Sequence, residues 1–262
     1  MTDRDLKEAS DALWQHWQQG TRIDSLPVSI RPSTRAAGYA VQARLEARST
    51  APLFGWKIAA TSKAGQAHIA VQGPLAGRLL AERVFSNGAE IPFGANHMRV
   101  AEAEFAFRMA SDLPSRTKAF GVDDVLDAVG SLHPAIELPD SRYHDFTKVG
   151  EAQLIADNAC AHYFVLGDAA PDTWRSLDLA AHVVTARIAG EPDRQGNGAN
   201  VLGDPRAALT WLVNELSDLG ITLNAGQVVT TGTCVMPLPI EPGDRVIADF
   251  GVLGRVEARV GR

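Results

Sequence analysis

Hydrophobic periodicity divides the chain into a helical N-terminal part and a strand-rich remainder. The apolar positions in residues 3–19 recur every three or four residues, which predicts an amphipathic helix that ends at Gly20. A second stripe of the same kind, between Pro32 and Pro52, predicts another helix. We therefore expect residues 1–52 to form an N-terminal helical cap on a larger domain, residues 53–262.

Beyond residue 53 the apolar runs become short and are separated by glycine and proline. Asn87-Gly88 predicts the turn of a hairpin over residues 84–91, and Thr61 is expected to cap a short helix, 62–69. Asp204-Pro205 marks the start of a longer helix. The other expected strands cover residues 54–60, 100–107, 135–138, 163–166, 181–188, 227–230, 245–250 and 255–260. This pattern favours an α+β domain rich in antiparallel and mixed sheet.

The strand expected at residues 100–107 carries two carboxylates on one face. Side chains alternate across the pleat, so Glu102 and Glu104 share one side while Phe105 and Phe107 lie on the apolar side. Two carboxylates about 7 Å apart beside a buried layer repel each other unless a positive group lies between them. A divalent cation would supply that charge, and a solvated strand face is the alternative.

Glu137 is a third carboxylate in an apolar setting. An ionised side chain in the segment 134–139 is costly to bury without a counter-charge. Three carboxylates with no histidine or cysteine beside them form an oxygen site that suits Mg²⁺ or Mn²⁺ better than zinc. Alternatively, Arg142 neutralises Glu137 in a purely structural pair.

Two other positions could take part in chemistry. Lys57 lies in an otherwise apolar strand, where a desolvated amine has a lowered pKa and can act as an acid or base near neutrality. The alternative is a lysine that extends its amine to the surface. Thr233 follows a strand, where its hydroxyl can face a ligand, whereas Lys63 is expected to point to water.

Composition narrows the functional classes. The net charge is −6, with lysine and arginine scattered along the chain, which argues against binding nucleic acid or an anionic membrane. There is no long apolar run and no signal-like N-terminus, and the two cysteines stand far apart. We expect a soluble protein of the reducing cytoplasm.

A set of motifs in the same order along nearly the whole chain carries a family resemblance. They are Gly55-Trp56-Lys57-Ile58, Ala101-Glu102-Ala103-Glu104-Phe105, Pro134-Ala135-Ile136-Glu137, Asp140-Ser141-Arg142, Leu202-Gly203-Asp204-Pro205, Thr231-Gly232-Thr233 and Ala248-Asp249-Phe250-Gly251. In these segments the chain resembles the 2-keto-4-pentenoate hydratase and 4-oxalocrotonate decarboxylase family, within the fumarylacetoacetate hydrolase superfamily.

The resemblance implies a fold and a site. The fold would be a mixed β-roll or sandwich core of the fumarylacetoacetate hydrolase type with an N-terminal helical cap. Mg²⁺ or Mn²⁺ would be held by Glu102, Glu104 and Glu137. Lys57 would be catalytic and lie near the substrate, and we count Thr233 and Arg142 with Lys57 as expected substrate-binding residues.

The implied activity is a hydratase in aromatic meta-cleavage catabolism that adds water to a 2-hydroxy-2,4-dienoate or 2-oxo-4-enoate acid. Two alternatives remain open: a decarboxylase or C–C hydrolase that uses the same enolate site, and a non-catalytic scaffold that partners a related enzyme. A homo-oligomer, and in some pathways a hydratase–decarboxylase complex, is also implied.

One departure from the family pattern concerns water. Typical hydratases carry acidic residues near the positions that Gln72 and Leu75 occupy here, and such an acid is a candidate to orient or deprotonate water. Glu82 or a bound water could substitute. The run Cys160-Ala161-His162-Tyr163 also departs from the usual serine-rich run, which suggests a different substrate tail.

Overall fold

A computed structural model describes all residues, 1–262. Its α-helices are α1 Asp3–Gln19, α2 Arg35–Ala43, α3 Lys63–His68, α4 Val122–Leu126, α5 Glu151–Ala156 and α6 Pro205–Asp218. Its strands are β1 Gly55–Ala59, β2 Leu75–Leu79, β3 Val84–Ser86, β4 Glu90–Ile91, β5 Val100–Met109, β6 Val129–Leu138, β7 Tyr163–Leu166, β8 Val183–Ile188, β9 Arg194–Asn197, β10 Val228–Thr233, β11 Leu238–Pro239, β12 Arg245–Asp249 and β13 Arg255–Val260.

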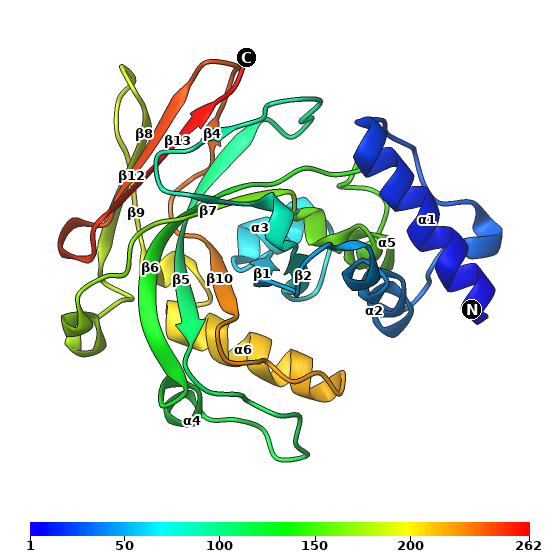
Figure 1. Cartoon of the computed structure of the whole chain (residues 1–262), viewed down its shortest axis with the longest axis horizontal. Helices are drawn as coiled ribbons and strands as arrows, with labels where there is room; N and C mark the ends of the chain where they lie inside the picture. Colours follow the sequence, from blue (N-terminus) through cyan, green and yellow to red (C-terminus); the bar gives the residue numbers. More distant parts are fainter.

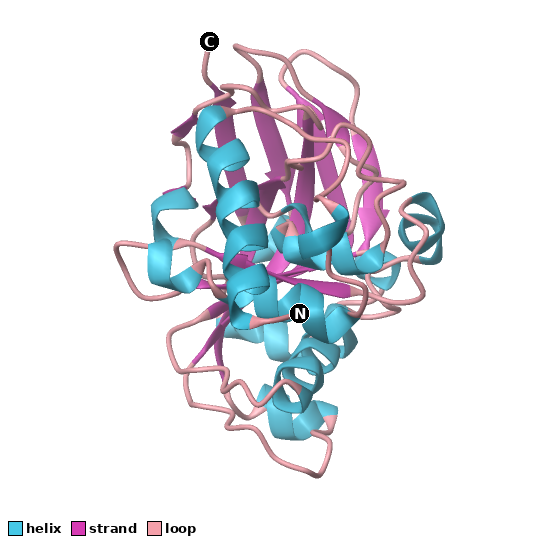
Figure 2. Cartoon of the chain, turned by 90° about the vertical axis from the view of Figure 1, so that its right-hand side faces the viewer, coloured by secondary structure: helices cyan, strands magenta, loops and turns pink.

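The N-terminal helices form where the apolar stripes predict them. The Thr2 hydroxyl accepts a hydrogen bond from the backbone N–H of Asp5 and the Asp5 carboxylate accepts one from Thr2, so a capping box starts α1. The second helix is shorter than expected, because α2 ends at Ala43 and a 3₁₀ turn, Glu46–Arg48, replaces its last part. These helices lie to one side of the strands and α2 packs on α5 (Figure 1). From that side, helices stand in front of the strands (Figure 2).

Two curled sheets form the core of the molecule. The larger sheet has the order β2-β1-β10-β5-β6-β7-β3, with β11 paired to β5. The smaller sheet has the order β4-β13-β12-β8-β9, and β12 and β13 pack against β6 (Figure 1). The ring of Phe105 meets that of Phe250, beside β12, edge-on at 5.1 Å. One face of β5 is thereby buried against the smaller sheet, which leaves its other face for the carboxylates.

The hairpin expected at residues 84–91 is wrong, although its turn forms. Gly88 adopts a φ of 80°, and the Ala89 N–H donates to the Ser86 carbonyl. The strands on either side do not pair with each other, because β3 pairs in parallel with β7 and β4 pairs in parallel with β13. Pairing with distant strands therefore prevails over the local turn signal, and the turn links the two sheets.

Both helix starts predicted beyond residue 53 form, one with a different cap. Asp204 caps α6 by accepting a hydrogen bond from the backbone N–H of Arg206, with Pro205 as first residue. Ser62, not Thr61, caps α3, since its hydroxyl accepts from Gly65 at 3.0 Å. Thr61 is buried instead and packs against Gly232.

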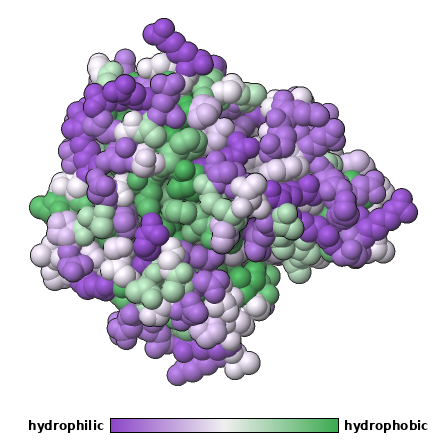
Figure 3. All heavy atoms as spheres, viewed as in Figure 1, coloured by the Kyte–Doolittle hydropathy of each residue, from purple (hydrophilic) through white to green (hydrophobic).

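The expected fold class is confirmed: the chain has a mixed β-roll core with helices at its N-terminus. A separate cap domain, residues 1–52, stays a prediction. No helix is long and apolar enough to cross a bilayer. In the view of Figure 1, apolar side chains gather in the middle of the face, while polar ones predominate over the N-terminal helices on the right (Figure 3).

Candidate active site

Strand register brings the three predicted carboxylates together. In the antiparallel pair of β5 and β6, Glu102 lies directly opposite Glu137. Glu104 is two residues along β5, on the same face, and Thr233 of β10 lies opposite it. Like charges directly opposite each other destabilise a sheet, so this register marks a site that has a purpose other than stability.

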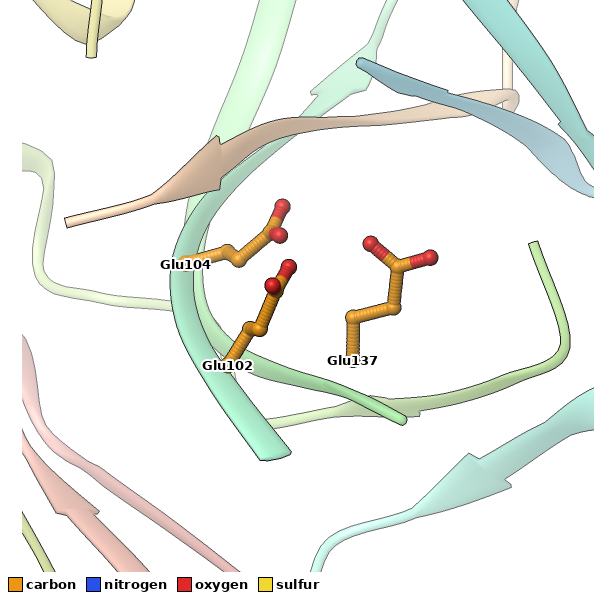
Figure 4. Close-up of side chains that lie close together, drawn as sticks. All are labelled: Glu102, Glu104 and Glu137. Carbon is orange, nitrogen blue, oxygen red and sulfur yellow. The ribbon is translucent and has the colours of Figure 1, made fainter. Parts of the chain in front are cut away.

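The carboxylate groups of Glu102, Glu104 and Glu137 converge on one point. Each can offer an oxygen such that all three lie within 4.8 Å of one another (Figure 4). Glu104 Oε2 accepts hydrogen bonds from the Thr230 hydroxyl at 2.5 Å and from the Gly232 backbone N–H at 2.7 Å. Its other oxygen, Oε1, is buried and accepts none, and the same holds for Glu137 Oε2.

Burial dominates the electrostatics of this cluster. It raises the pKa of Glu102 to about 7, with a further contribution from the negative charge of Glu137. Burial also raises the pKa of Glu137, and it raises that of Glu104 well above its usual range. Carboxylate oxygens that accept no hydrogen bond and converge on one point are the ligands that a hard divalent cation requires. These residues therefore fit Mg²⁺ or a similar ion.

Lys57 is a buried ammonium group beside this cluster. Its Nζ lies 3.1 Å from Glu137 Oε1 and donates to the carbonyl of Ala159 at 3.1 Å. Burial by itself would lower the pKa of Lys57, but the charges of Glu137, Glu102 and Glu104 together outweigh it and raise the pKa. The expectation of a lowered pKa is therefore wrong for this arrangement, and so is the alternative of an amine that extends to the surface.

An unusual backbone turn brings the Ala159 carbonyl to Lys57. Asn158, Ala159 and Cys160 have φ values of 56°, 50° and 61°, in the left-handed region, which costs about 1–2 kcal/mol for residues such as Ala159 and Cys160 and less for asparagine. The Asn158 side chain holds the turn on β2, since its amide accepts from the Arg78 N–H and donates to the Arg78 carbonyl. Strain that persists in this way is typical of functional sites.

Lys57, Glu102 and Thr233 line a cavity of about 1090 Å³. The Thr233 hydroxyl donates to the carbonyl of Val235, which leaves its oxygen lone pairs available as acceptors. Lys63 was expected to point to water; it is exposed, yet it lies on the wall of this cavity. The structure thus brings five of the six predicted site residues to one place.

The sixth, Arg142, does not line the cavity. Its guanidinium is buried, forms an ion pair with Asp157 and donates to the carbonyls of Asp140 and Ala161. The suggested pair between Arg142 and Glu137 is wrong, because Lys57 occupies that place. This geometry gives Arg142 a structural position rather than the expected contact with substrate.

No acidic side chain in the cavity replaces the acids that typical hydratases carry near the positions of Gln72 and Leu75. Leu75 lines the cavity, whereas Gln72 is exposed and lies outside its lining. Glu82, the suggested substitute, also lies outside the lining and accepts a hydrogen bond from Ser49. Glu102 is the only carboxylate among the lining residues.

Sequence reasoning missed the groups that hold Glu104 and Lys57 in place. Gly232 has a φ of 95°, and a Cβ there would lie 2.2 Å from Thr61 Oγ1. A Cβ at Gly77, opposite Lys57 on β2, would lie 2.4 Å from the Asn158 carbonyl. In the sequence, only Gly232 between two threonines and Gly77 inside an apolar strand could have indicated these close approaches.

Fold and site together define a class: a mixed β-roll protein with a candidate divalent-cation site at the base of a ligand-sized cavity. The chain belongs to the fumarylacetoacetate hydrolase family, because the family model described as "Fumarylacetoacetate (FAA) hydrolase C-terminal" matches residues 50–261.

The similar proteins include hydratases and a decarboxylase. The chain is 32% identical to 2-keto-4-pentenoate hydratase of Paraburkholderia xenovorans, covering 93% of this chain and 90% of that protein. It is 31% identical to 2-oxo-hept-4-ene-1,7-dioate hydratase of Escherichia coli, covering 94% of each. The solved structure of 4-oxalocrotonate decarboxylase from Pseudomonas putida G7, in complex with magnesium and adipate, superimposes with a TM-score of 0.89 at 28% identity, covering 99% of this chain and 98% of that one.

Proposed function

We propose that this protein is a metal-dependent hydratase that converts 2-hydroxy-2,4-dienoate or 2-oxo-4-enoate acids to 4-hydroxy-2-oxo acids in aromatic meta-cleavage catabolism. The observation that carries the proposal is the convergence of Glu102, Glu104 and Glu137 beside Lys57 in one cavity. Relatives named as hydratases, similar over more than nine-tenths of the chain, support it. A scaffold protein has no need of this charge cluster, which is costly to bury.

We propose that Glu102, Glu104 and Glu137 hold Mg²⁺ or Mn²⁺. When bound, such an ion acts as a Lewis acid and stabilises the negative charge of an enolate. The hydrogen bonds from Thr230 and Gly232 fix Glu104 and leave its Oε1 free to face the ion.

Lys57 is the proton donor in this proposal. Its raised pKa keeps the amine protonated at neutral pH, and the Ala159 carbonyl and Glu137 hold Nζ in one position. An ammonium group fixed in this way can deliver a proton to the carbon chain of the substrate as the enol becomes a ketone, and the proton released from the enol hydroxyl restores the ammonium group. The oxygen of Thr233, on the strand that pairs with that of Lys57, accepts a hydrogen bond from the substrate.

A decarboxylase is the second candidate, and a specific observation favours it. Glu102 is the only carboxylate lining the cavity, so no further acid is placed there to activate water. Decarboxylation needs the same stabilisation of an enolate but no activated water. A C–C hydrolase would need that water, so the observation does not favour it.

The assembly and the compartment are further parts of the proposal. We infer a homo-oligomer of the cytoplasm, with a hydratase–decarboxylase complex as an additional assembly, from the family resemblance. Both cysteines are free, which agrees with a reducing compartment.

Product analysis by NMR tests the proposal. The enzyme, with Mg²⁺, is incubated with a small panel of 2-oxo-enoates and 2-oxo-enedioates. A carbinol signal at C4 is the expected result. Release of CO₂ instead would replace the hydratase with the decarboxylase, and absence of any reaction would contradict both.

A further inference from the structure

A second lysine, Lys63, lines the cavity on a segment well before the carboxylates in the sequence. It is the first residue of helix α3. Lys63 forms no ion pair, whereas Lys57, the other lysine in the lining, is paired with Glu137. The positive charge of Lys63 is therefore available to a ligand.

The side chain of Lys63 is held at the wall by a neutral partner. Its Nζ donates to Gln66 Oε1 at 3.3 Å, and the Gln66 amide nitrogen donates to the Ala60 carbonyl at 3.1 Å. Gln66 is itself buried and lines the cavity. The amide thus positions the ammonium group without neutralising it, which leaves two of its three protons free to bind an anion.

The rest of the lining suits a carbon chain between two anionic ends. Met98, Val100 and Val235 contribute apolar wall, and more than half of the lining residues are hydrophobic. The volume of about 1090 Å³ slightly exceeds the usual range for small-molecule sites, so there is room beyond a short 2-oxo acid. His68 is the only other basic side chain in the lining besides the two lysines.

We propose that Lys63 binds the distal carboxylate of the substrate and that the preferred substrate is a 2-oxo-enedioate rather than a monoacid. The inference rests on the proposed function, since the head of the substrate is taken to lie at the carboxylate cluster. A charge-assisted hydrogen bond from Nζ then holds the tail. Gln66 is a positioning residue, because it acts through Lys63.

A substrate pair tests the inference. Steady-state kinetics compares 2-oxohept-4-ene-1,7-dioate with 2-hydroxypenta-2,4-dienoate for the wild type, Lys63→Gln and the surface control Lys118→Gln. We expect the ratio of kcat/KM for the dioate to that for the monoacid to fall about 5- to 30-fold in Lys63→Gln, mainly through KM; water screens the charge of this exposed lysine and limits the effect. Lys118→Gln should leave the ratio unchanged.

The outcomes distinguish a failure of the proposed role of Lys63 from a failure of the proposed hydratase function. An unchanged ratio in Lys63→Gln, with both substrates consumed, would overturn the role of Lys63 and leave the hydratase proposal standing. Equal loss on both substrates would also overturn it, because a merely structural role acts on both. If the wild type consumes neither substrate, the proposed function itself fails. Rising ionic strength should raise the KM of the dioate for the wild type more than for Lys63→Gln.

Discussion

At the scale of single residues, the interior of this protein contains ion pairs that are almost fully buried. Arg142 and Asp157 form one such pair beside the cap, and Lys57 and Glu137 form another at the base of the cavity. Each buried charge depends on its partner, since an isolated one is costly. The two pairs differ in their surroundings: the second belongs to the cluster of three converging carboxylates, and it alone borders the cavity.

The position of Arg142 predicts a loss of stability on substitution. Arg142→Met leaves the Asp157 carboxylate buried without its cation, and we expect the free energy of unfolding to fall by about 3–5 kcal/mol. Urea denaturation measures this loss. Arg187→Met is the matched control; its pair with Asp193 is exposed and should be worth less than about 1 kcal/mol. A stable Arg142→Met with a raised KM would instead restore the predicted contact with substrate.

At the scale of elements, the register of β5 and β6 and the bend of β10 build the site. Strand β10 pairs with β5 from Val228 to Thr230 and again at Thr233, with an irregularity between them. Gly232 lies in that irregularity and turns its N–H toward Glu104. A glycine in a strand interior is explained here by close approach, because Thr61 occupies the space of its missing side chain.

Gly232→Ala should therefore weaken cation binding. The substitution forces a positive φ on alanine and a clash with Thr61, which displaces the N–H from Glu104. Loss of such an outer contact lowers metal affinity about 10- to 100-fold, as calorimetric titration with Mg²⁺ would show. Gly243→Ala is the control, since its φ of 96° also forces a positive φ on alanine, while the added Cβ would meet only the Arg262 side chain in ordinary contact at 3.8 Å. Equal Mg²⁺ affinity in both variants would contradict the role of Gly232.

Sequence patterns predict the faces of these elements better than their pairing. The alternation around Glu102 and Glu104 placed both on one face, and this needs only the local pleat. The partner of Glu102 across the sheet is Glu137, thirty-five positions later, and no local signal specifies that register. The hairpin over residues 84–91 failed for the same reason. Arg142 was misplaced because its partner, Asp157, also follows from the fold and not from spacing.

At the scale of the whole molecule, the burial of the carboxylate cluster, complete for Glu104 and Glu137 and partial for Glu102, links stability to cation binding. Burial raises the pKa of Glu102 to about 7, above its value in the unfolded chain. Between these two values the folded state without a cation binds more protons than the unfolded state. Its stability therefore falls as pH rises through this interval.

Mg²⁺ should reverse this trend. The ion binds the ionised carboxylates, so it competes with protons and stabilises the folded state more as pH rises. We expect the increase in Tm on adding a fixed Mg²⁺ concentration to be larger at about pH 8 than at about pH 6, measured by differential scanning fluorimetry. The same increase at both values of pH would contradict binding at buried carboxylates.

The cation dependence of hydration tests the central claim most directly. The initial rate of 4-hydroxy-2-oxo acid formation is measured on enzyme treated with a chelator, before and after Mg²⁺ is restored, for the wild type, Glu104→Gln and the control Glu82→Gln, whose carboxylate lies outside the cavity. We predict that Mg²⁺ restores the rate of the wild type and of Glu82→Gln, while Glu104→Gln stays folded and about 100-fold or more slower. A full rate without a cation, or an unimpaired Glu104→Gln, would contradict the account.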